Sequence, residues 1–100
     1  MMNFLQIKAG KVEIRKNSTL IRSIGNSDAV SAEFNIDQSL VIVTTNKGKV
    51  EIRKSNGVLV RSVGNGNAIN SKFFGPDIFI TLKNGKAELR SLNGILIRTF

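Results

Sequence analysis

The stretch from Gly48 to Gly64 reads Gly-Lys-Val-Glu-Ile-Arg-Lys-Ser-Asn-Gly-Val-Leu-Val-Arg-Ser-Val-Gly, and closely similar stretches occur at two other places in the chain. From Gly10 the chain runs Gly-Lys-Val-Glu-Ile-Arg-Lys-Asn-Ser-Thr-Leu-Ile-Arg-Ser-Ile-Gly, and from Gly85 it runs Gly-Lys-Ala-Glu-Leu-Arg-Ser-Leu-Asn-Gly-Ile-Leu-Ile-Arg-Thr-Phe. Self-similarity at a fixed period indicates stacked structural units that share a hydrophobic core. The repeat therefore decides the fold.

Short apolar runs, separated by turn residues, extend from this stretch in both directions. Runs of this length that are rich in Val, Ile and Leu favour strands, and no helical period lies between them. We therefore expect an all-β meander that forms a single repeat domain over residues 1–100. The eleven predicted strands are Phe4 to Lys8, Lys11 to Arg15, Thr19 to Ile24, Ala29 to Phe34, Leu40 to Thr45, Lys49 to Lys54, Val58 to Val63, Ala68 to Phe73, Ile78 to Leu82, Lys86 to Arg90 and Ile95 to Phe100.

Turn residues predict how neighbouring strands pair. Asn84-Gly85 is the signal of a two-residue type I′ turn, which would set Thr81 opposite Glu88. Ser55-Asn56-Gly57 predicts a three-residue loop whose glycine is left-handed. The first unit is one residue shorter at this place, and a two-residue turn at Asn17-Ser18 would absorb the difference.

These loops would set one acid opposite one base in every unit. Groups that repeat in this way could bind a ligand or act in catalysis, but their position in the middle of strands favours a structural role. We expect the arginine stems to lie between packed sheets. The predicted ion pairs are Glu13 with Arg22, Glu51 with Arg61, and Glu88 with Arg98.

The order of strands and turns from Ala29 to Asn65 carries a resemblance to a known family. A small-apolar strand ends in Phe34 and a turn, a second strand meets a turn at Gly48, and two further strands close the unit. This pattern resembles a blade of a WD-repeat β-propeller. Ile52-Arg53 stands where that family has Trp-Asp, and Gly64-Asn65 stands where it has Gly-His, so the family's buried polar network is not carried over.

The resemblance implies a partial blade over residues 1–24 and four-stranded blades over residues 29–63 and 68–100. That makes about two and three-quarter blades, whereas propellers use roughly four to eight. The terminal blades would expose apolar faces, so we expect a homo-oligomer that completes the ring, with a dimer favoured. A flat sandwich or an open stack of sheets is the alternative.

The composition argues against several functions. The chain has no Cys, no His, no Trp and no Tyr, so it lacks the usual general base, the thiol nucleophile and the thiolate metal ligands. We expect no catalysis, no metal and no cofactor. No stretch reads as a signal peptide or approaches the roughly 20 apolar residues of a membrane span, so we expect a cytoplasmic protein without a membrane partner.

The lysines give the sharpest functional signal. Fifteen Lys and Arg against seven Asp and Glu give a net charge of +8. In a meander, the turns that carry paired lysines share one rim with the connections 25–28 and 64–67, whose only charge is Asp28. The lysines are Lys8 and Lys11, Lys47 and Lys49, and Lys83 and Lys86.

Such a rim suits an acidic partner, either nucleic acid or an acidic protein. The alternative is that turn lysines only keep sheet edges soluble. The sequence thus favours a non-catalytic binding or scaffolding module. A purely architectural subunit of a larger assembly is the second hypothesis, and a propeller that binds a small ligand or sugar is the third. The six phenylalanines are expected in the core.

Overall fold

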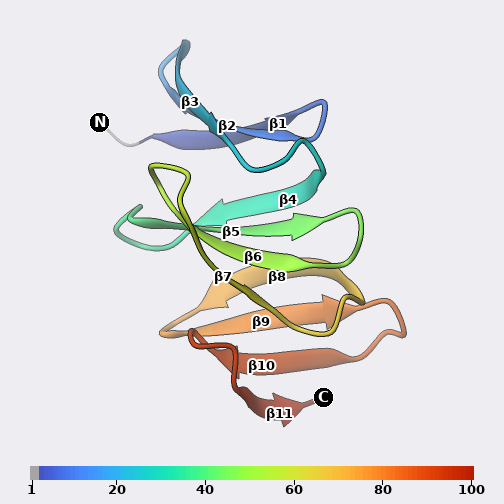
Figure 1. The fold of residues 1–100 in the computed structure, drawn as a ribbon. Coiled ribbons are helices and arrows are strands. Elements are labelled where there is room, and N and C mark those ends of the chain that lie inside the picture. The colour runs from blue at the N-terminus through green and yellow to red at the C-terminus, as the bar shows by residue number, and fades with distance from the viewer. Residues whose placement is uncertain (1–2) are drawn as a thin grey trace.

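The strands of the computed structural model, which describes residues 3–100, form three separate antiparallel sheets (Figure 1). No helix occurs in this part of the chain. In chain order the strands are β1 (Phe4–Lys8), β2 (Lys11–Lys16), β3 (Thr19–Ile24), β4 (Ala29–Phe34), β5 (Leu40–Thr45), β6 (Val50–Lys54), β7 (Leu59–Val63), β8 (Ala68–Phe74), β9 (Asp77–Leu82), β10 (Ala87–Ser91) and β11 (Leu96–Thr99).

Each sheet is a meander of strands that follow one another in the chain. The first sheet has the order β1-β2-β3, the middle sheet β4-β5-β6-β7 and the last sheet β8-β9-β10-β11. All eleven predicted strands are present, and each end lies within one residue of its prediction. The prediction of an all-β fold is therefore confirmed. The three sheets stack in an open row, which does not close on itself (Figure 1).

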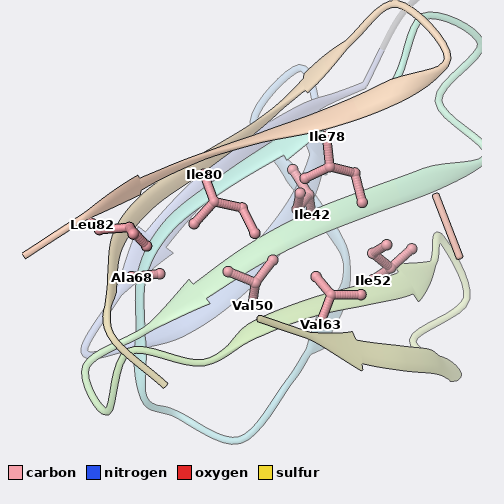
Figure 2. Close-up of a cluster of buried hydrophobic side chains, with 8 residues drawn as sticks. All are labelled: Ile42, Val50, Ile52, Val63, Ala68, Ile78, Ile80 and Leu82. Atoms are coloured by element: carbon pink, nitrogen blue, oxygen red, sulfur yellow. The ribbon is translucent and has the colours of Figure 1, made fainter. Parts of the chain in front are cut away.

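The core lies in two layers between the sheets. Val12 and Ile14 of the first sheet pack with Val41 and Val43 of the middle sheet. On the other face of the middle sheet, Ile42, Val50, Ile52 and Val63 meet Ala68, Ile78, Ile80 and Leu82 of the last sheet (Figure 2). Successive residues of a strand point to opposite faces, so β5 is buried on both sides and reads as a continuous apolar run.

Two of the three predicted turns are correct. At Asn17-Ser18 a two-residue turn joins β2 to β3. At Ser55-Asn56-Gly57 the Lys54 N–H donates to the Val58 carbonyl at 2.8 Å and Gly57 has a φ of 96°, which makes the three-residue loop.

The predicted type I′ turn at Asn84-Gly85 is wrong. A type I′ turn needs positive φ at both central residues, and here only Gly85 has it, at 84°. The Leu82 N–H instead donates to the Lys86 carbonyl at 2.8 Å, so the loop has three residues. In consequence Glu88 lies opposite Ile80 and not opposite Thr81.

A β-bulge recurs between the two outer strands of every sheet. In the middle sheet Arg53 lies opposite Leu59 but Ile52 lies opposite Arg61, so Val60 is the extra residue. The same shift makes Ile21 the extra residue in the first sheet and Ile97 the extra residue in the last. A bulge shifts the register of all residues beyond it by one. The predicted register, which assumed regular pairing, is therefore wrong by one residue there.

Candidate anion-binding rim

The six predicted lysines gather along one edge of the stack. The β1–β2, β5–β6 and β9–β10 turns all lie at this edge, on the right in Figure 1, and each carries two of the lysines. All six lysines are exposed. We call this edge the lysine rim; its members are Lys8, Lys11, Lys47, Lys49, Lys83 and Lys86.

A close backbone contact holds the rim turn of the middle sheet in place. The Ala68 N–H donates to the Gly48 carbonyl at 3.0 Å. A Cβ atom on Gly48 would lie 2.2 Å from the Gly66 carbonyl oxygen, so no side chain fits there. The two neighbours of this glycine, Lys47 and Lys49, are thereby anchored beside the connection to the last sheet, while their side chains remain exposed.

The charge of the rim is almost entirely positive. The adjacent connections, residues 25–28 and 64–67, contribute one carboxylate, Asp28. Within residues 3–100, the three ion pairs all join arginine to glutamate, so they involve no rim lysine. These pairs use three of the fifteen cations and three of the seven carboxylates, leaving twelve cations and four carboxylates. Half of the remaining cations are thus rim lysines.

The opposite edge of the stack is of mixed charge. There Asp37 accepts hydrogen bonds at its Oδ1 from the Ser39 hydroxyl, at 2.6 Å, and from the Ser39 N–H, at 3.0 Å. These bonds favour the ionised form and lower the pKa of Asp37. An open cleft of about 410 Å³ lies beside it, and Glu33 and Phe73 contribute to its walls. With two carboxylates at this cleft, the opposite edge lacks the uniform positive charge of the lysine rim.

The predicted ion pairs across strands do not form. Each glutamate instead binds the arginine two residues further along its own strand: Glu13 with Arg15 at 3.0 Å, Glu51 with Arg53 at 3.0 Å, and Glu88 with Arg90 at 2.8 Å. Residues two apart share a face of a strand, which brings the two side chains together. The bulge moves Arg22, Arg61 and Arg98 out of register with these glutamates, and it sets them on the other face.

Two of these arginines reach the neighbouring sheet. Arg22 Nη1 of the first sheet donates to the Asn56 carbonyl of the middle sheet at 3.0 Å. Arg61 Nη1 of the middle sheet donates to the Asn93 carbonyl of the last sheet at 3.3 Å. These arginines therefore join sheets, and they are not partners of the glutamates.

Sequence reasoning missed an aromatic cluster on the last sheet. The Phe79 ring lies 6.2 Å from the Phe74 ring and 5.9 Å from the Phe100 ring, measured between centroids. Lys72 Nζ lies 5.5 Å from the Phe79 centroid. Phe74 and Phe100 are each 57% exposed, so the expectation that every phenylalanine is in the core is wrong. The available signal was alternation, because residues beside the buried Ile78 and Ile80 must face the other way.

Two further features, a cluster of metal ligands and a membrane-spanning helix, are absent from the part of the chain that the structure describes. No group of three or more His, Cys, Asp and Glu residues could hold a metal ion there. Within the same residues, no helix is long and apolar enough to span a bilayer. Comparison with protein-family models and with curated proteins found no match to this chain.

Proposed function

We propose that this protein is a non-catalytic binding and scaffolding module that associates with itself and presents the lysine rim to an acidic partner. The observation that carries this proposal is the alignment of three lysine-bearing turns on one edge, with Asp28 as the only carboxylate of the adjoining connections. Like charges held on neighbouring rigid turns attract a polyanion more strongly than the same charges scattered over a surface.

We further propose that the sheets are blades of a propeller-like assembly. Each complete sheet is a four-stranded meander, as the resemblance to WD-repeat blades implies, and the sheets pack face to face. The first and last sheets each leave one face uncovered by any other part of residues 3–100. A second copy could cover these faces. This same observation favours the second candidate function, a purely architectural subunit without an acidic partner.

A binding experiment separates the two functions. The probes are labelled duplex DNA, single-stranded RNA and poly-glutamate, each titrated with the protein at several salt concentrations. For duplex DNA, removing four lysines that contact phosphates reduces the slope of log K against log salt by roughly 3 to 4. The variant Lys47→Ser/Lys49→Ser/Lys83→Ser/Lys86→Ser should therefore lose most of its affinity and salt dependence.

The matched control removes the same number of lysine charges at the opposite edge of the stack. Lys47→Ser/Lys49→Ser is compared with Lys16→Ser/Lys54→Ser, whose lysines lie toward the opposite edge. Only the first pair should weaken binding. Equal losses in both pairs, or full binding by the rim variant, would show that the rim is not the site. The preference among the three probes then tells nucleic acid from acidic protein.

A further inference from the structure

The contact between neighbouring sheets is repeated along the stack. The arginine of the outer strand donates to the carbonyl of an asparagine in the next sheet, first from Arg22 to Asn56 and then from Arg61 to Asn93. The two donors hold the same position in the repeat, and so do the two acceptors. The contact is therefore a property of the repeat and not of one pair of residues.

The two faces of each sheet are different. We call the face that carries the outer-strand arginine the forward face, and the face that carries the Glu–Arg ion pair the rear face. In the middle sheet, Arg61 lies opposite Ile52, which packs on the last sheet. Glu51 lies opposite Val43, which packs on the first sheet. Every buried layer thus joins a forward face to a rear face.

One forward face and one rear face are left open. On the last sheet, Arg98 lies opposite Leu89 on the open forward face, beside the exposed rings of Phe74 and Phe100. On the first sheet, Glu13 lies opposite Gln6 on the open rear face. The open faces thus carry the same arginine and the same Glu–Arg pair that meet in both buried layers. The aliphatic part of the rear face differs, because Gln6 takes the place that Val43 and Ile80 hold in the other two sheets.

The steric fit at the edge of the interface repeats as well. A Cβ on Gly57 would lie 3.2 Å from Ile24 of the preceding sheet, and a Cβ on Gly94 would lie 2.9 Å from Val63. The residue of the last sheet that corresponds to Ile24 and Val63 is Phe100.

The first sheet has Ser18, which carries a Cβ, at the place of these glycines, so an apolar side chain against it must lie slightly further away than in the buried layers. Arg15 Nη1 donates to the Ser18 carbonyl, as Arg53 Nη1 does to the Gly57 carbonyl and Arg90 Nη1 to the Gly94 carbonyl. The preceding residue, Asn17, then corresponds to the two asparagines that accept from arginine in the buried layers.

We infer that the open forward face of one copy docks on the open rear face of a second copy of this chain. In the docked pair, the Arg98 guanidinium donates to the Asn17 carbonyl of the second copy, and the Phe100 ring packs against Ser18. The two faces are different, so the contact is head to tail, and a pair joined by one such contact still has one face of each kind to offer. The docked pair depends on the self-association in the proposed function, whereas the lysine rim is independent of it.

Sedimentation of complementary variants tests this contact. Arg98→Glu disrupts the forward face, and Ser18→Trp blocks the rear face. Both residues are exposed in the single chain, so the melting temperature at low concentration should not change. Each variant alone should associate at least about tenfold more weakly than the wild type, because a charge-assisted hydrogen bond or close packing is lost. Their mixture should form a heterodimer, because each partner supplies the intact face that the other lacks.

Cysteine pairing gives a second readout, since the chain has no cysteine of its own. At the equivalent buried positions, a Cβ added to Gly94 would lie 3.6 Å from the Val63 Cβ, which is within the range that a disulfide spans. Under mild oxidation, Ser18→Cys mixed with Phe100→Cys should give a mixed disulfide dimer. The control replaces Ser18→Cys by Ile36→Cys, at a residue that is 95% exposed, and should give little mixed product.

The outcomes separate the contact from self-association itself. A wild type that stays monomeric at every concentration overturns both. A wild type that associates while Arg98→Glu and Ser18→Trp associate equally well overturns only the contact. If Ser18→Trp alone remains fully associated, two forward faces meet each other, and the head-to-tail arrangement is wrong.

Discussion

The middle and last sheets place the same segment of the repeat in two different environments. Ile52 and Val63 are 1% and 7% exposed, because the last sheet covers the forward face of the middle sheet. On the last sheet the corresponding residues are Leu89, partly buried, and Phe100, 57% exposed. The comparison shows that the strands form from their own sequence pattern, whereas burial depends on whether a neighbouring sheet is present.

The largest expected effect comes from truncating the apolar residue at one position of the repeat, which is Ile52 in the middle sheet and Leu89 in the last sheet. Ile52→Ala should lower the free energy of unfolding by about 2–5 kcal/mol, because it opens a cavity in a closed layer. Leu89→Ala should cost clearly less in dilute solution, because water reaches that face. Urea unfolding of both variants measures the difference. Equal losses would show that the forward face of the last sheet is covered within a single chain.

The rim glycines provide the next comparison. Gly48 and Gly85 have φ values of 81° and 84°, so alanine at either place should cost roughly 1–2 kcal/mol in backbone strain. Gly48→Ala should cost about 1–3 kcal/mol more, because its Cβ would displace the connection to the last sheet. No atom lies within 4 Å of a Cβ on Gly85. Thermal unfolding of the two variants would contradict this account if their stabilities were the same.

A third comparison concerns the Glu–Arg pair on the rear face of the middle sheet, which the first sheet covers, and the pair on the rear face of the first sheet, which is open. The Arg53 side chain is 11% exposed, whereas the Arg15 side chain is 23% exposed. Glu51→Gln should cost about 1–3 kcal/mol, because it leaves a buried guanidinium without its carboxylate. Glu13→Gln should cost less, because water solvates Arg15. Unfolding in low and high salt measures the loss of stability of both variants. A larger loss for Glu13→Gln than for Glu51→Gln would contradict this prediction.

The smallest expected effect concerns the turn between the first two strands of each complete sheet. In the middle sheet this turn, between β4 and β5, contains the hydrogen-bonded Asp37, and in the last sheet the turn between β8 and β9 is Gly75-Pro76. The folded state lowers the pKa of Asp37, so its contribution to stability is present above the ordinary carboxyl pKa. This contribution is lost as the pH falls through the lower pKa of the folded state. Asp37→Asn should flatten this part of the acid unfolding profile slightly. A carboxyl titration followed by NMR checks the direction of the shift.

The strands and the lysine rim could be predicted from the sequence because both follow from local rules. Alternating apolar runs place the strands, and the count of turns in a meander decides which edge each turn reaches. The bulge residues Ile21, Val60 and Ile97 carry no glycine or proline signal, so their register could not be foreseen. The turn at Asn84-Gly85 matched a frequent pattern, but Asn84 does not adopt the positive φ that this pattern requires.

The aromatic cluster was missed for a different reason. Alternation along β9 shows that Phe79 faces away from Ile78 and Ile80, but whether that second face is covered depends on the position of the sheet in the stack. Phe34 and Phe73 do pack against the two core layers, whereas Phe74 and Phe100 lie on the open face of the last sheet. Order along the stack is a property of the whole chain and not of one unit.

The layer between the middle and last sheets contains a buried hydrogen bond, at 2.6 Å, between the Thr44 and Ser71 hydroxyls. In the layer between the first and middle sheets, Ile7 lies opposite Val12 as Thr44 lies opposite Val50. Ala32 lies opposite Val43 as Ser71 lies opposite Ile80, so Ile7 and Ala32 hold the corresponding places. If the sheets stacked in the wrong sequence during folding, a hydroxyl would be left facing an aliphatic side chain without a partner, which is unfavourable in a dry interior. This buried polar pair therefore favours the native order of the sheets over an order in which the first and last sheets are exchanged.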